Sequence, residues 1–194
     1  MSCPTLESHA DLMELLDRYR QRWPGEAAVV AEFESLLRQD DAPFTRERSA
    51  GHFTGSAWLV DASGTRVLLT HHRKLGRWLQ LGGHADGETD LAQVARREAS
   101  EESGLEGLQV EAEVFDLDRH WIPERGEEPG HWHYDVRHVV RTGADQAFVV
   151  GEESLDLAWR EIASIAADQF RGDGADESLR RMARKWLQRT SSPA

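Results

Sequence analysis

Residues 82–105 read GGHADGETDLAQVARREASEESGL, a double glycine followed by a helix with well-marked ends. Thr89 or Asp90 is placed to cap the free amides of the first turn. Gly104 supplies the left-handed position at which helices often end. The pattern predicts a glycine-rich loop up to Asp90 and a helix over 91–103.

Three glutamates of this helix, Glu98, Glu101 and Glu102, stand at positions i, i+3 and i+4. The spacing puts their carboxylates on one helical face, where they repel one another unless a cation neutralises them. Carboxylate oxygens favour Mg²⁺ or Mn²⁺, and Mg²⁺ usually binds through a few carboxylates plus substrate phosphates. The glutamates therefore predict a metal site for a diphosphate substrate. A solvated acidic face, with Arg97 paired to Glu101, is the alternative.

The same segment resembles the Nudix box, whose pattern is G-x5-E-x7-R-E-U-x-E-E-x-G-U with U aliphatic. The matching positions are Gly83, Arg97, Glu98, Glu101, Glu102, Gly104 and Leu105. Two positions depart from the pattern. Thr89 stands where the first glutamate is expected, with Glu88 one residue early, and Leu81 stands where relatives usually have proline. We expect these departures to weaken the support of the loop and not to remove the three-carboxylate cluster.

This resemblance implies a Nudix fold, an αβα sandwich with a mixed sheet, and hydrolysis of a nucleoside diphosphate linked to another group. Glu98, Glu101 and Glu102 would be ligands of Mg²⁺ or Mn²⁺. The Gly83 carbonyl would be a further ligand, and Arg97 would orient the carboxylates. Cations that bridge two phosphates neutralise developing charge and activate a water for in-line attack.

Hydrophobic periodicity predicts the elements around this centre. Apolar residues at helical spacing over 12–23 and 30–37 predict an N-terminal helical hairpin, an appendage over 1–50 for packing or dimerisation. Strands are predicted over 56–60, 66–72, 108–115, 131–141 and 156–160. An amphipathic helix around 179–187 closes the chain. We expect the catalytic domain to cover 51–194, with its sheet between helices.

Acidic residues outside the box are candidates for the general base. In many Nudix relatives a glutamate on a loop outside the box takes this role, and Glu152 and Glu153 stand in the corresponding place. The box carboxylates serve as the base in other relatives. An ordinary acidic loop is the remaining interpretation of the pair.

Histidines and basic residues are candidates for substrate contacts. His131, His133 and Asp135 alternate and therefore share one face of a strand. They are candidates for a second metal or for a substrate phosphate, or they are ordinary hydrogen-bonded residues. Arg73 and Lys74 belong to a basic cluster before the double glycine, where phosphate or base recognition would be useful. Exposed hairpin ends are the alternative for that cluster.

Other side chains extend this set. His84 directly follows the double glycine and is a further candidate for substrate binding. Trp78, Trp121 and Trp132 are candidates for stacking on a nucleobase, although aromatic residues in strands usually belong to the core.

Composition limits the class of protein. The 194 residues carry 35 acidic and 23 basic side chains, a net charge of −12, and 39% hydrophobic residues. The acidic surface disfavours nucleic acid as a partner, and the sequence has neither an apolar run of membrane-spanning length nor a signal peptide. A single cysteine, Cys3, excludes an internal disulfide. We expect a cytoplasmic protein that acts on a small nucleotide, with the N-terminal helices suggesting a homodimer.

Two other functions are compatible with a Nudix fold. A module that binds a nucleotide for regulation without cleaving it is the main alternative, but such modules tend to lose carboxylates of the box. Isomerisation of a diphosphate would need a cysteine and a glutamate in the pocket, whereas Cys3 lies far upstream of the box. The preferred expectation is a hydrolase.

Overall fold

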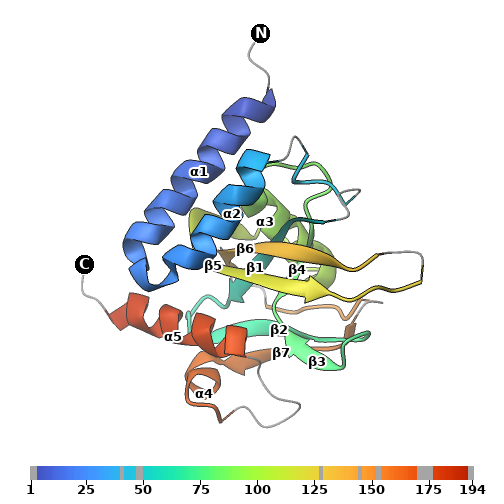
Figure 1. The fold of residues 1–194 in the computed structure, drawn as a ribbon. Helices are drawn as coiled ribbons and strands as arrows, with labels where there is room; N and C mark the ends of the chain where they lie inside the picture. The colour runs from blue at the N-terminus through green and yellow to red at the C-terminus, as the bar shows by residue number, and fades with distance from the viewer. Residues whose placement is uncertain are drawn as a thin grey trace.

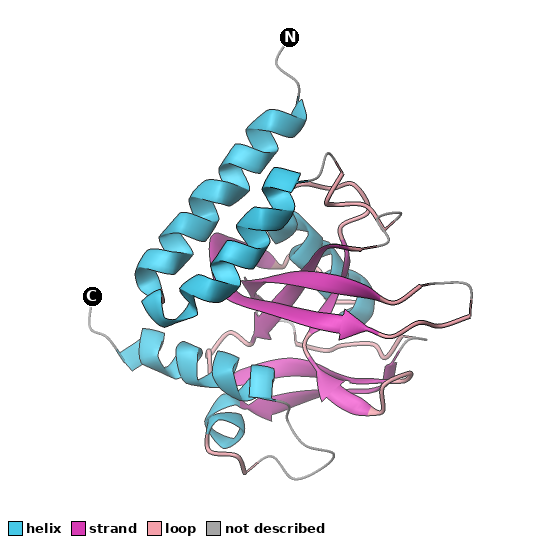
Figure 2. Cartoon of the chain, in the orientation of Figure 1, coloured by secondary structure: helices cyan, strands magenta, loops and turns pink. Residues whose placement is uncertain are grey.

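The computed structural model describes residues 4–39, 42–46, 50–126, 129–143, 146–151, 154–169 and 177–191. They form a mixed sheet between layers of helices, the αβα sandwich expected from the sequence (Figure 1, Figure 2). Within these ranges, none of the helices combines the length and the apolar character that crossing a membrane requires.

Seven strands make the sheet in the order β3-β2-β1-β6-β5, with β4 paired to β1 and β7 paired to β2. The strands are β1 (Gly51–Val60), β2 (Arg66–His72), β3 (Arg77–Leu79), β4 (Leu81–His84), β5 (Gln109–Ile122), β6 (His131–Arg141) and β7 (Ser154–Glu161). β1 and β6 are parallel, and β5 runs antiparallel to β6 (Figure 1). The parallel register places His52 beside His133 and Thr54 beside Asp135.

The prediction of one continuous glycine-rich loop before residue 91 is wrong in its first half, which forms β3 and β4. In β4, Gly82 lies opposite Ser56 and Gly83 lies opposite Gly55 of β1. A Cβ on Gly82 would come within 2.7 Å of the Ser56 Cα. The glycines therefore serve a close approach of two strands rather than a flexible loop.

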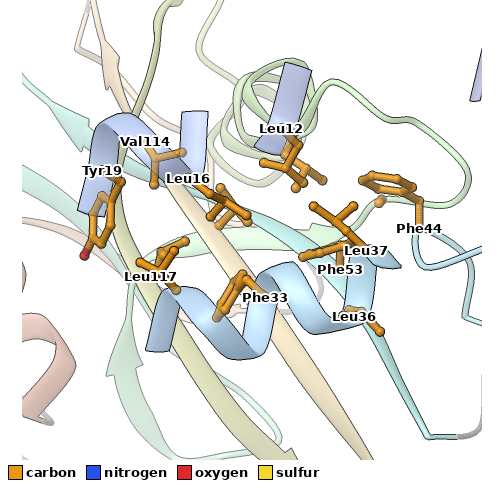
Figure 3. Close-up of a cluster of buried hydrophobic side chains, with 14 of the residues drawn as sticks. Leu12, Leu16, Tyr19, Phe33, Leu36, Leu37, Phe44, Phe53, Val114 and Leu117 are labelled. Carbon is orange, nitrogen blue, oxygen red and sulfur yellow. The ribbon is translucent and has the colours of Figure 1, made fainter. Parts of the chain in front are cut away.

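The predicted N-terminal hairpin is confirmed as α1 (Pro4–Arg22) and α2 (Ala27–Gln39). Leu16 and Phe33 of the hairpin belong to one hydrophobic cluster with Phe53 of β1 (Figure 3). A fully buried side chain of this kind contributes about 1.5–3 kcal/mol to folding. The hairpin thus shares its core with the sheet, while a role in dimerisation stays a prediction.

The central helix, α3 (Leu91–Ser103), has the bounds expected from its end signals. Asp90 caps it by accepting hydrogen bonds from the amides of the second and third helical residues, at 3.1 and 3.2 Å. Gly104 ends it with φ at 70°. The helix packs on the sheet at Gly55, where a Cβ would come within 2.8 Å of Val94. This close packing sets the position of α3, and so of its glutamates, relative to the sheet.

A buried ionic network fastens the opposite face of the sheet. The helices on that face are α4 (Ile162–Ala166) and α5 (Glu177–Ser191). Asp116 of β5 accepts hydrogen bonds from Arg137 at 3.1 Å, and from Arg181 and Lys185 of α5 at 2.7 Å each. Burial raises the pKa of Asp116, but the three cations outweigh this effect and hold it below its usual value. The network therefore joins β5, β6 and α5.

Candidate active site

The position of Glu98 depends on a glycine. A Cβ on Gly83 would come within 2.5 Å of the Glu98 carboxyl carbon, so a larger residue would displace this carboxylate. Arg97 donates to Glu98 Oε1 at 2.8 Å and to the His84 carbonyl at 2.9 Å. Burial raises the pKa of Glu98, Arg97 opposes the rise, and the nearby charge of Glu101 adds to it. The guanidinium thus ties the carboxylate to β4.

The other two glutamates of α3 have different surroundings. Glu102 Oε1 accepts a hydrogen bond from the Gly82 amide at 2.7 Å. Glu101 is 64% exposed, and its nearest cation is Arg97 Nε at 4.0 Å. Among the described residues, a group of histidines and not these glutamates brings three ligand atoms within 4.8 Å of one another. An open arrangement suits Mg²⁺, which keeps several waters and shares its coordination with substrate phosphates.

A cleft of about 780 Å³ lies beside the glutamates. Its size falls within the range of about 300–1,000 Å³ that is typical of small-molecule sites. The predicted site residues that line it are Lys74, Gly83, His84, Arg97, Glu98, Glu101, Glu102, His133 and Asp135. The fold therefore brings the box and the later strand motif to one cleft, although they are separate in the sequence.

The remaining predicted residues are placed differently. Arg73 donates to the Ser154 carbonyl at 2.9 Å and is not part of the cleft lining. His131 is buried and also lies outside the lining. Glu152 and Glu153 are outside the described residues, so a base role for either stays a prediction.

Asp135 lies at the floor of the cleft and already has several protein partners. It accepts hydrogen bonds from Ser56 at 2.7 Å, Thr54 at 3.0 Å, Arg137 at 2.7 Å and Gln80 at 3.3 Å. Only 2% of the residue is exposed. These contacts tie β1, β6 and the residue between β3 and β4 together at the base of the cleft.

Five histidine rings gather at one end of the cleft, from β1, β4, β5 and β6. His133 is central, with ring centroids 4.9 Å from His52, 5.0 Å from both His84 and His131, and 5.4 Å from His120. Burial, together with the four neighbouring imidazoles, lowers the pKa of His133 to about 2. The central ring is therefore neutral near neutral pH, with its nitrogens available for hydrogen bonds or a metal.

The three tryptophans considered for base stacking do not line this cleft. Trp78 is buried and stacks on His71 with ring centroids 5.2 Å apart. Trp121 and Trp132 pack edge to face at 5.2 Å. The Arg119 guanidinium lies 3.8 Å from the Trp132 ring centroid. Their contacts in this structure are with protein side chains.

Several residues of the site are missed by sequence reasoning. Thr54 and Ser56 line the cleft from β1, and His120 lines it from β5. Strand alternation is the signal that would find Thr54 and His120, but the two strands predicted there begin at residue 56 and end at residue 115. Ser56 is the first residue of its predicted strand. Glu88, noted as one position early in the box, accepts a hydrogen bond from the Asp90 amide at 3.0 Å. It therefore supports the start of α3.

The chain also resembles known proteins in sequence and in fold. A family model described as "NUDIX domain" matches residues 52–182. No curated protein matches the chain. A MutT protein from Methanosarcina mazei is 14% identical, covering 75% of this chain and 99% of its own, with a TM-score of 0.56. A NUDIX family hydrolase from Clostridium perfringens is 20% identical, covering 71% and 97%, with a TM-score of 0.53. The dihydroneopterin triphosphate pyrophosphohydrolase of E. coli is 16% identical, covering 71% and 95%, also with a TM-score of 0.53.

Proposed function

Because this chain belongs to the NUDIX domain family, we propose that it is a divalent-metal-dependent hydrolase of a nucleoside diphosphate linked to another group. The observation that carries the proposal is the presence of Glu98, Glu101 and Glu102 on one face of α3 at an open cleft. A module that only binds has no need for three carboxylates that repel one another. Solved structures of similar fold include a NUDIX family hydrolase and a pyrophosphohydrolase, which supports this class of reaction.

The donor set fits Mg²⁺ or Mn²⁺, because all of its members are oxygens. Glu98, Glu101 and Glu102 would hold the ion, with the Gly83 carbonyl as a further ligand. When bound, such a cation neutralises charge on a diphosphate and lowers the pKa of a bound water. The close approach of Glu98 to Gly83 supports this assignment, since it places the Glu98 carboxylate next to the backbone of Gly83. Any residue larger than glycine at position 83 would collide with that carboxylate.

Protein groups around the cleft would orient the ligands and the substrate. Arg97 fixes one oxygen of Glu98, and the Gly82 amide fixes one oxygen of Glu102. A carboxylate has two oxygens and several lone pairs, so a hydrogen bond that orients it is compatible with binding a cation. Lys74 lies exposed at the cleft and would offer its ammonium to a substrate phosphate. His84 and His133, with Asp135 beneath them, would contact the remainder of the substrate.

We assign the general base to Glu153, with Glu152 as the alternative. The flanking residues Gly151 and Ser154 line the cleft, which supports a base from this segment. Glu153→Gln should lower turnover and remove the acid limb of the pH–rate profile. A profile unchanged in Glu153→Gln and in Glu152→Gln would return the role to a carboxylate of the box.

A release assay tests the main proposal. Diphosphate compounds of five classes would be incubated with and without Mg²⁺ or Mn²⁺: ADP-ribose, dinucleoside polyphosphates, nucleotide sugars, CDP-alcohols and oxidised nucleoside triphosphates. Glu101→Gln and Glu102→Gln should each reduce metal-dependent turnover by at least about tenfold. Glu106→Gln, an exposed residue beyond the helix end, is the matched control.

The outcomes separate the candidate functions. Unchanged rates in both variants would reject Glu101 and Glu102 as ligands of the catalytic metal. Tight binding of one compound without cleavage of any would favour the regulatory module. A cytoplasmic location and a homodimer are further proposals, and light scattering of the purified chain would test the dimer.

A further inference from the structure

Three histidines from two strands face one another where β1 and β6 begin. His52 of β1 lies opposite His133 of β6 in the parallel register, and His131 precedes His133 by two residues. The ligand nitrogens of the three rings all lie within 4.8 Å of one another. We call His52, His131 and His133 the histidine trio. None of them belongs to the Nudix box.

We propose that the histidine trio binds a late first-row divalent metal ion, with Zn²⁺ as the expected occupant, at a site distinct from the glutamates of α3. His131 Nε2 and His133 Nε2 are 3.1 Å apart. Two nitrogens bound to one tetrahedral Zn²⁺, with bonds of about 2.0–2.1 Å, lie roughly 3.4 Å apart. A small outward rotation of the His133 ring therefore makes room for an ion between them.

A backbone carbonyl orients the ring of His131. Its Nδ1 lies 2.9 Å from the Pro129 oxygen. Because a carbonyl can only accept, Nδ1 carries the proton, and Nε2 of the neutral ring turns its lone pair toward the trio. A hydrogen bond from the second nitrogen to a carbonyl is the usual support of a metal-bound histidine. His52 stacks on the same ring at a centroid distance of 5.0 Å, which restricts its rotation.

The trio combines two buried side chains with one that is accessible from the cleft, as a metal site requires. His52 and His131 are only 1% and 4% exposed, so two ligands are fixed in the interior. His133 lines the cleft, so an ion on the trio would be reached from there. Three imidazoles and one open position are the ligand set of zinc sites that retain an exchangeable water.

Donor chemistry separates this site from the one on α3. Imidazole nitrogens suit zinc, copper, nickel and cobalt, whereas carboxylate oxygens suit Mg²⁺ and Mn²⁺. A proton shared between His131 and His133, with His133 donating, is the competing account of their 3.1 Å contact. The two accounts differ in whether added Zn²⁺ binds.

The test uses the full chain carrying Glu98→Gln and Glu102→Gln, in which the proposed magnesium site is removed and hydrolysis is not the readout. After treatment with a chelator, the protein is titrated with Zn²⁺ by calorimetry and with Co²⁺ by visible absorption. We expect one ion per chain, tetrahedral Co²⁺ bands and a higher Tm with Zn²⁺. His131→Gln and His133→Gln, each added to this chain, should weaken Zn²⁺ binding by at least about tenfold.

His71→Gln is the matched control, because His71 is a half-buried histidine of β2 that stacks on Trp78. It should bind Zn²⁺ as tightly as its parent. Near-UV circular dichroism of the metal-free variants checks their fold. If one substitution unfolds the chain, the other substitution and the Co²⁺ spectrum of the parent still show whether the trio binds the ion. Absence of Zn²⁺ binding in the parent, or binding unaffected by the folded variants, would overturn the proposal and leave a hydrogen-bonded histidine pair.

Discussion

The glutamates of α3 and the histidine trio differ in donor chemistry, in burial and in how the chain assembles them. The glutamates come from one helix and offer oxygens, and Glu101 is 64% exposed. The trio comes from two strands and offers nitrogens, with His52 and His131 almost fully buried. The comparison teaches that the fold places two kinds of donor group close together, oxygens on a helix and nitrogens on two strands, which favour different metal ions.

The two clusters also have different supports. The glutamates are held by contacts within α3 and with β4, namely from Arg97, from the Gly82 amide and at Gly83, which has no side chain to displace Glu98. The trio instead lies next to buried charged residues of β6, because Asp135 and Arg137 follow His133 at alternate positions of that strand. Changes in the buried network should therefore affect folding, while changes near α3 should affect activity.

The largest expected effect is on folding. Arg137 is 2% exposed and donates to Asp135 at 2.7 Å and to Asp116 at 3.1 Å. Arg137→Met leaves these carboxylates without that cation and should lower the free energy of unfolding by about 3–5 kcal/mol. Urea denaturation measures it. Arg141→Met on the same strand removes an ion pair whose Arg side chain is 41% exposed, and should cost less than about 1 kcal/mol. Equal losses would contradict the assigned role of the network.

The second effect is on turnover. Glu98→Gln should reduce metal-dependent hydrolysis by about 100-fold, since a lost metal ligand removes several kcal/mol of transition-state stabilisation. Without metal, the variant should be at least as stable as the parent, because burial penalises the charged carboxylate and raises its pKa. Steady-state kinetics and thermal denaturation test the two statements. Loss of stability together with activity would mean that Glu98 serves the fold.

Two adjacent glycines give a smaller and sharper contrast. An alanine Cβ at position 83 would meet the movable Glu98 carboxylate, whereas at position 82 it would meet the Ser56 backbone. Gly83→Ala should lower turnover by about tenfold with little change in stability. Gly82→Ala should lower the free energy of unfolding by about 1–3 kcal/mol. Parallel kinetics and urea denaturation would show whether the two effects separate, and identical profiles would refute the contrast.

The smallest effect concerns pH in the metal-free protein. The pKa of His133 is lowered to about 2 by burial and by His84, His120, His52 and His131, while an unfolded histidine titrates near about 6.5. Between these values the unfolded chain binds more protons at this ring. Stability from it is therefore full above about pH 6.5 and declines as the pH falls, by at most about 1.4 kcal/mol per pH unit.

Glu98 acts in the opposite sense, because a raised carboxyl pKa makes the folded state bind the proton more readily as the pH falls. Between pH 7 and pH 5, His133→Gln should flatten the decline of Tm, and Glu98→Gln should steepen it at the acid end. Thermal denaturation across this range is the measurement. Parallel curves for both variants and the parent would show that neither group governs the response.

Local signals explain which elements are predictable. α3 has the predicted bounds because Asp90 and Gly104 act within one turn of its ends. β6 has them because polar and apolar residues alternate over 131–137 and β-branched valines follow at 139 and 140. β3 and β4 have three and four residues, too short for a periodic signal, and the glycines of β4 imitate a loop. β5 extends past its predicted end, with register shifts beside Val114.

The sequence by itself determined the helix with its caps, its three carboxylates and the family, because spacing on a helix is set by residues close along the chain. Only the tertiary structure decided that His52 lies beside His133, that Ser56 and Thr54 bind Asp135, and that Glu98 fits against Gly83. The register between β1 and β6 is a long-range pairing, and a shift of one residue would turn every side chain to the other face. The spacing of residues along the chain therefore does not predict how β1 pairs with β6.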